Sequence, residues 1–107
     1  MPMIIVLTTI STGGQAEVLA EKIVASNLAA CVQVLPQMTS FYVWEGEMHR
    51  DPEHLVLIKT LAEKYDELEA FIRQNHSYDV PEIIAIEADK VSRAYFEWIS
   101  AAVTRPR

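Results

Sequence analysis

The longest feature of this sequence is a pair of β-rich runs, residues 29–48 and 53–60, which the segment His49-Arg50-Asp51-Pro52 separates. An Asp-Pro pair disfavours helix and suits a turn, so we predict a long β-hairpin that turns at this segment. At about 3.3 Å per residue, a ten-residue arm reaches roughly 33 Å, whereas a compact chain of this size has a radius of gyration of about 13 Å. The hairpin is therefore expected to protrude.

The first arm of this hairpin carries four large apolar residues in succession, Phe41, Tyr42, Val43 and Trp44. Because side chains alternate across a strand, large apolar groups face both sides of the pleat. One small domain covers one face, and a second copy of the chain is expected to cover the other. We therefore predict that Phe41, Tyr42 and Trp44 lie in a subunit interface.

Composition limits the domain count and the partners. A chain of 107 residues, of which 50% are hydrophobic, is expected to form one domain, residues 1–107. The net charge of −6 argues against nucleic acid and anionic membranes as partners, because both require concentrated Lys and Arg. No basic leader or membrane-spanning run is apparent, and the single cysteine, Cys31, fits a reducing compartment. We expect a cytoplasmic protein.

Hydrophobic patterning predicts a strand, a helix and a second strand before the hairpin arm. Residues 4–9 are a continuous β-branched and apolar run, which is typical of a strand buried on both faces. Thr12 and Gln15 have the spacing of a capping box, so a helix is expected from this point to about Asn27. The second strand opens at Ala29, and Pro36 predicts a bend or bulge within it.

After the hairpin, the spacing of apolar residues predicts a second helix that ends at about Asn75. Pro81 leads into a short strand at residues 83–86, and an apolar stripe over residues 91–102 predicts a final helix, which Pro106 would stop. The order is β-α-β-β-α-β with an extra C-terminal helix. Right-handed crossovers stack the first two helices on one sheet face, so we predict a ferredoxin-like α+β fold.

Four motifs, distributed along nearly the whole chain, closely resemble those of the CutA divalent-cation tolerance proteins. They are Asn27-Leu28-Ala29-Ala30-Cys31-Val32, Tyr42-Val43-Trp44-Glu45-Gly46-Glu47, Ile58-Lys59-Thr60 and His76-Ser77-Tyr78-Asp79-Val80-Pro81-Glu82-Ile83. The resemblance implies a ferredoxin-like homotrimer held by extended hairpins, similar in architecture to the nitrogen-regulatory PII signal proteins. It also implies tolerance of copper and other divalent metals. The chain departs from the family at Ser77, where proline is expected, and at Val43, where a second large aromatic is expected.

Cys31 is the first candidate metal ligand, because a thiolate suits Cu(I) and the resemblance points to this position. The alternative is an ordinary packed cysteine, since free cysteine is among the most buried residue types. No pair of cysteines, and no Cys-His pair, has the spacing of a structural zinc site. A threefold assembly would nevertheless bring together three copies of Cys31 or of His76, the second candidate ligand. Copper or another divalent ion is the expected cofactor.

His76, Tyr78 and Glu82 follow the second predicted helix, and together with Lys59 they form a candidate binding cleft. The resemblance places this set in a cleft between subunits. In the structural alternative, His76 caps the helix and Glu82 pairs with Lys59. Two further histidines, at positions 49 and 54, bracket the predicted turn and are expected to be solvated there.

Three classes of function remain: a metal-binding or metal-tolerance protein, a trimeric PII-like sensor of a small molecule, and a structural assembly module. The first is preferred, chiefly because of the resemblance. The sequence contains no serine elbow, no metalloprotease helix and no dinucleotide loop, so we do not expect an enzyme.

Overall fold

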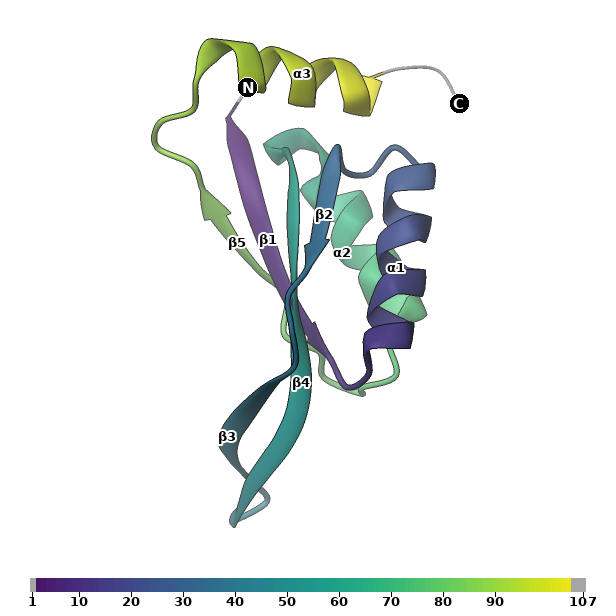
Figure 1. Cartoon of the computed structure of the whole chain (residues 1–107), viewed down its shortest axis with the longest axis vertical. Helices are drawn as coiled ribbons and strands as arrows, with labels where there is room; N and C mark the ends of the chain where they lie inside the picture. The colour runs from purple at the N-terminus through teal and green to yellow at the C-terminus, as the bar shows by residue number, and fades with distance from the viewer. Residues whose placement is uncertain (1, 105–107) are drawn as a thin grey trace.

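A five-stranded antiparallel sheet and three helices make up the mixed α+β fold of the computed structural model, which describes residues 2–104 (Figure 1). The four core strands lie in the order β2-β4-β1-β5, and β3 pairs with the outer part of β4. In chain order, the elements are β1 (Met3–Ile10), α1 (Gly13–Ala25), β2 (Cys31–Val34), β3 (Met38–Trp44), β4 (Glu47–Leu61), the 3-10 turn η1 (Ala62–Lys64), α2 (Tyr65–Asn75), β5 (Ile84–Glu87) and α3 (Arg93–Thr104).

The long hairpin is present, but the predicted position of its turn is wrong. The turn is formed by Glu45 and Gly46, whose φ angles of 51° and 80° both lie in the left-handed region. Two such residues make the tight loop that joins twisted antiparallel strands, as the register Trp44↔Glu47 requires. The segment predicted to turn instead belongs to β4, where Pro52 lies opposite Thr39. Proline is tolerated there because the outer part of β4 pairs with a strand on one side only.

The expectation that the hairpin protrudes is confirmed. Figure 1 shows β3 and the outer part of β4 extending well beyond the body formed by the other elements. The molecule accordingly measures 45 × 28 × 24 Å along its principal axes. Pro36 lies between β2 and β3, at the predicted interruption of this arm.

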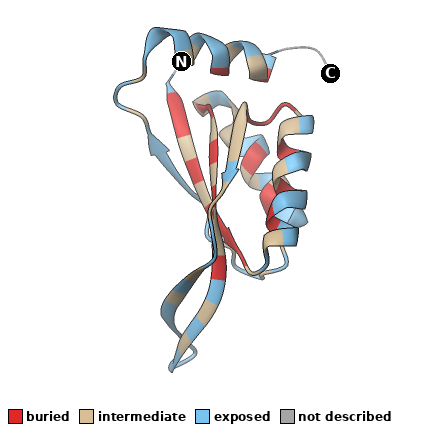
Figure 2. Ribbon diagram, viewed as in Figure 1, coloured by how far each residue is buried: buried red, intermediate tan, exposed pale blue. Residues whose placement is uncertain are grey.

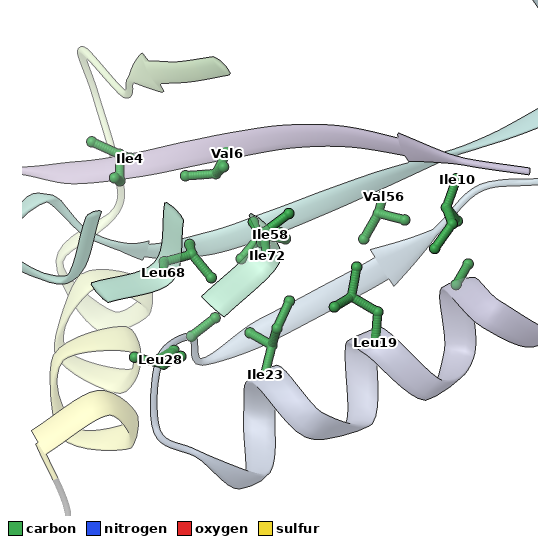
Figure 3. Packing of buried hydrophobic residues seen from close by; sticks show 12 residues of the cluster. Ile4, Val6, Ile10, Leu19, Ile23, Leu28, Val56, Ile58, Leu68 and Ile72 are labelled. Atoms are coloured by element: carbon green, nitrogen blue, oxygen red, sulfur yellow. The ribbon is translucent and has the colours of Figure 1, made fainter. Parts of the chain in front are cut away.

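The main core lies between one face of the sheet and helices α1 and α2 (Figure 3). Val6 and Ile58 project from the sheet, and Ile23, Leu68 and Ile72 meet them from the two helices; all five side chains are fully buried. Thr12 caps α1, because its Oγ1 accepts a hydrogen bond from the Gln15 amide at 3.2 Å. Because α1 and α2 both pack against this face of the sheet, the prediction that the first two helices stack on one face is confirmed.

Helix α2 ends at Asn75 as predicted, whereas the predicted end of α1 and the start of α3 differ from the structure by two residues. Helix α1 ends at Ala25, two residues early, because Asn27 adopts a φ of 59° that a right-handed helix does not allow. Helix α3 begins at Arg93, where the Ser92 hydroxyl accepts a hydrogen bond from the Tyr95 amide at 3.2 Å. The predicted stop at Pro106 lies outside the described residues.

A second, smaller core fixes α3 across one end of the sheet (Figure 1). It consists of Met3, Leu61, Ile99 and Val103, all at most 5% exposed. None of the helices in the described part of the chain is long and apolar enough to cross a membrane.

The other face of the sheet lacks a comparable helical layer. Cross-strand partners project to the same face, so Leu7, Leu57 and Ile84 form one row across it. Ile84 and Ile86 are about half exposed, and Figure 2 shows β5 as an exposed strand. The expectation that the first strand is buried on both faces is confirmed for the helix-covered face and in part for the other, where Thr9 is buried and Ile5 and Leu7 are half-buried. We call this second surface the open sheet face.

Candidate functional site

The segment that follows α2 is fixed by the imidazole of His76, which stands at the C-terminal cap position of that helix. Its Nε2 lies 2.6 Å from the Thr9 carbonyl oxygen, and its Nδ1 lies 3.1 Å from the Tyr78 amide nitrogen. A carbonyl oxygen only accepts and an amide only donates, so Nε2 carries the proton and Nδ1 is the acceptor. Both nitrogens of the neutral ring are therefore in use.

Tyr78 continues this attachment to the base of the hairpin. Its hydroxyl donates to Glu53 Oε2 at 2.8 Å, and its ring lies 4.6 Å from that of His76, measured between centroids. Burial, followed by the hydrogen bond to the Glu53 carboxylate, raises the pKa of Tyr78 to about 12. Since Glu53 is only 9% exposed, its carboxylate depends on this donor. The segment is thus tied to both β1 and β4.

Lys59 does not lie beside His76 and Tyr78 within one chain. Lys59 pairs in register with Ile5, whereas His76 contacts Thr9, four residues or about 13 Å further along β1. The Lys59 ammonium instead lies 5.6 Å from the ring centroid of Tyr95.

The predicted pairing of Glu82 with Lys59 is also absent. Glu82 is exposed, and the ion pairs found within residues 2–104 are Arg73–Glu69 and Lys90–Asp89. Of the structural alternatives, the cap position of His76 is confirmed and the ion pair of Glu82 is wrong. Of the four residues predicted to form a cleft, His76 and Tyr78 are in contact within one chain.

Cys31 lies at the start of β2, opposite Lys59, as a free and half-buried thiol on the open sheet face. It is near the end of the sheet that α3 covers, away from the contact between His76 and Thr9. In residues 2–104, no three His, Cys, Asp or Glu side chains are grouped so that they could hold a metal ion. The two candidate ligands thus do not form a common site in one subunit.

The two histidines of β4 do not bracket a turn, and that prediction is wrong. His49 stacks on Tyr42 with ring centroids 5.2 Å apart, and His54 Nδ1 lies 2.9 Å from the Leu35 carbonyl oxygen. His54 thereby secures the backbone just before the interruption at Pro36.

The hairpin presents large apolar side chains to the exterior. Phe41 is 63% exposed, Trp44 52% and Tyr42 42%. The Arg50 guanidinium lies 5.2 Å from the Phe41 ring centroid, and the Tyr42 hydroxyl donates to Asp51. These contacts order the aromatic rings without covering them.

Glu53 is the member of this site that sequence reasoning missed. It is one of 15 acidic residues, and no motif or spacing distinguishes it in the sequence. Its role follows from the strand register, which places it opposite Met38 at the base of the hairpin, within reach of Tyr78.

The fold and the site together define a class of protein: a small antiparallel α+β subunit with one protruding hairpin and an apolar open sheet face. The sequence model of the family described as CutA1 divalent ion tolerance protein matches residues 4–102. The chain therefore belongs to the CutA family.

Individual relatives agree with this assignment. Protein CutA 1, chloroplastic, from rice is 38% identical over 99 residues, which are 92% of this chain and 56% of the relative. The divalent-cation tolerance protein CutA of Thermus thermophilus is 37% identical over 95 residues, which are 89% and 92% of the two chains. The chain thus spans about half the length of the plant relative and nearly all of the bacterial one.

Solved structures confirm the arrangement of the elements. CutA1 from Oryza sativa superimposes with a TM-score of 0.93 at 37% identity, covering 95% of this chain and 94% of that one. A protein from Archaeoglobus fulgidus, described as a periplasmic divalent cation tolerance protein CutA, gives a TM-score of 0.91 at 30% identity, covering 94% and 98%. The relatives are named as tolerance proteins, and their stated locations include the chloroplast and the periplasm.

Proposed function

We propose that this chain is a divalent-cation tolerance protein without enzymatic activity, that it works in the cytoplasm as a homotrimer, and that it binds copper or another divalent ion. Membership of the CutA family supports the tolerance function. The chain order of the core elements, β1-α1-β2-β4-α2-β5, supports a ferredoxin-like subunit formed by a single domain.

The main observation that supports the proposed trimer is the exposed apolar surface of the hairpin. Val43, Trp44 and Met48 are 62%, 52% and 70% exposed, on an arm that has no helix packed on either side. Apolar side chains concentrated in this way favour an interface, and in a homotrimer each hairpin covers part of a neighbouring subunit. The half-exposed open sheet face supplies a complementary surface.

Light scattering after size exclusion tests this assembly. The expected mass is about three times the 12.1 kDa of one chain. A stable monomer at micromolar concentration would contradict the trimer and, with it, any metal site that requires several subunits.

The proposed metal site rests on Cys31. A thiolate is a soft donor suited to Cu(I), and Cys31 is free on a face that we propose is directed toward other subunits. Because one subunit has no complete ligand set in its described part, the remaining donors must come from neighbouring subunits. His76 is the weaker candidate, since a metal would have to displace one of its two hydrogen bonds.

Titration of the trimer with Cu(I) and Cu(II), in competition with a chelator, tests the site. The Cys31→Ser variant should lose the Cu(I) site and keep its trimer mass, because serine offers no soft donor. His76→Ala is the comparison variant and should retain Cu(I) binding. Unchanged Cu(I) affinity in Cys31→Ser would make Cys31 a packing residue and would favour a sensor of small molecules.

A further inference from the structure

A groove of about 270 Å³ lies between α1 and the C-terminal end of α2, outside the site described above. Its lining includes Ile10, Val18 and Leu19 among the apolar residues, and Lys22, Asn75 and Ser77 among the polar ones. Cys31, Lys59, His76, Tyr78 and Glu82 do not line it. The groove belongs to a single subunit, so its occupation depends neither on the proposed metal site nor on the trimer.

The apolar lining of the groove consists of two buried residues and one exposed residue. Ile10 and Leu19 are each 2% exposed because they belong to the main core, which fixes their positions. Val18, by contrast, is 54% exposed on α1, although its side chain is entirely hydrocarbon. A ligand that covered Val18 would remove apolar surface from water and would gain free energy in proportion to that area.

The polar part of the groove is positively charged. Lys22 Nζ lies 3.5 Å from Asn75 Oδ1, which is at the outer limit of a hydrogen bond. The ion pairs found in the described residues do not involve Lys22, so its ammonium has no carboxylate partner there. Asn75 uses one amide N–H to bind the Phe71 carbonyl oxygen and has a second one, and the Ser77 hydroxyl lies at the same rim.

Two further features favour a negatively charged occupant. Gly14, in the first turn of α1, lines the groove, and the N-terminal end of a helix carries a partial positive charge. Apart from its chain neighbours and the backbone of α1, no described atom lies within 4 Å of the position that a Cβ of Gly14 would occupy, so there is open space at this end of the groove. Lys22 and the N-terminal end of α1 thus make the groove locally positive, although the net charge of the chain is −6.

We propose that the groove binds a small monocarboxylate with a short hydrocarbon body, of the short-chain fatty-acid type. The carboxylate pairs with Lys22 and accepts from Asn75, and the hydrocarbon covers Val18 above the floor of Ile10 and Leu19. The volume lies just below the range of about 300–1,000 Å³ that is usual for ligand pockets, so the groove accommodates a small ligand. For so small a ligand in an open groove, we expect a dissociation constant of about 1 mM.

Titration of the full chain with hexanoate, followed by two-dimensional ¹H–¹⁵N NMR, tests the proposal. We expect saturable shifts of the amides in residues 14–22 and 75–77. Hexylamine has the same hydrocarbon body and the opposite charge, and 1-hexanol has no charge, so neither should give saturable shifts there. Equal binding of hexylamine, or no saturation by hexanoate up to about 20 mM, would overturn the proposal.

Matched lysine variants separate the ammonium of Lys22 from general surface charge. Lys22→Gln keeps a polar side chain but removes the charge, and it should weaken hexanoate binding at least about fivefold. Lys90→Gln is the control, because Lys90 is far from Lys22 in the sequence. Its side chain is 90% exposed and pairs with the adjacent Asp89. Its affinity for hexanoate should match the wild type. Equal weakening in both variants, or unchanged affinity in Lys22→Gln, would refute the assignment of Lys22.

Discussion

Replacing Tyr78 with phenylalanine removes one hydroxyl group and leaves the Glu53 carboxylate without the donor that lies 2.8 Å away. Glu53 is 9% exposed, so water replaces that donor poorly. A hydrogen bond to a charged group contributes about 1.5–3 kcal/mol, and we place this one at about 2 kcal/mol because Tyr78 itself is partly exposed. Tyr78→Phe should therefore lower the free energy of unfolding by about that amount at pH 8.

The alkaline pH dependence tests the same hydroxyl in a second way, because burial first and the hydrogen bond to Glu53 second raise its pKa. The pKa of Tyr78 is raised from 10.0 to about 12 in the folded chain, so between these values the unfolded state releases the phenolic proton first. The stabilisation is complete below pH 10 and is lost as the pH rises toward 12. The difference in stability between wild type and Tyr78→Phe should therefore shrink over this interval. Tyr42 and Tyr65, whose pKa values are also raised, are present in both proteins and cancel.

Urea unfolding at one fixed protein concentration, at pH 8 and at pH 11.5, is the appropriate assay, because the stability of the proposed trimer would depend on concentration. Tyr95→Phe is the matched control: it also removes a tyrosine hydroxyl, but the contacts with the Lys59 ammonium and the Trp98 ring are made by the aromatic ring, which phenylalanine keeps. Tyr95→Phe should change the stability by less than about 0.5 kcal/mol. Equal losses in the two variants, or a Tyr78→Phe effect that persists undiminished at pH 11.5, would refute the reasoning.

Three further substitutions test other parts of the fold. Among residues 2–104 the buried Thr8 hydroxyl has no hydrogen-bond partner, so Thr8→Val should raise the urea-unfolding free energy by about 1 kcal/mol; a decrease would indicate that the hydroxyl has a partner. Glu45 has a φ of 51°, which asparagine tolerates better, so Glu45→Asn should add about 0.5 kcal/mol by the same assay, and a loss would contradict the assigned turn. Trp44→Ala should weaken the trimer by about 2 kcal/mol in sedimentation experiments and Glu47→Ala much less; an unchanged trimer mass in Trp44→Ala at all concentrations would remove the hairpin from the interface.

The hairpin shows what sequence patterning can and cannot predict. Its existence and length follow from two apolar β-rich runs, since few other structures accommodate them. Its turn was misplaced because Asp51-Pro52 is a strong local signal against helix, yet an edge strand accepts proline opposite Thr39. The true turn uses Glu45-Gly46, and glutamate is an unusual residue at its positive φ angle. Local propensity was overruled here by the pairing register of the two strands.

The candidate site was predictable only in part, for a related reason. His76 and Tyr78 are two residues apart, so their proximity follows from the sequence alone. Their partners, Thr9 and Glu53, come from two other strands and were identified only by the fold. Lys59 is grouped with them because an imidazole, a cation and a carboxylate are typical of binding clefts, and the resemblance places the set between subunits; the register of β4 with β1 separates Lys59 from His76 within one chain. A pattern in the sequence does not show which residues far apart in the chain come into contact.

Strand β4 runs without a break through all 15 residues from Glu47 to Leu61 and spans most of the 45 Å length of the molecule (Figure 1). The inner part of β4 is the second strand of the core sheet, and its outer part is one side of the hairpin. This side of the hairpin is therefore continuous with the core sheet, with no loop between them. A load on the tip is therefore transmitted along the backbone to β1 rather than absorbed by bending at a loop. Inserting one residue beside His54 would also turn every side chain in the outer part of β4 to the opposite face. The register of the core sheet therefore determines which side chains the hairpin tip presents to a partner.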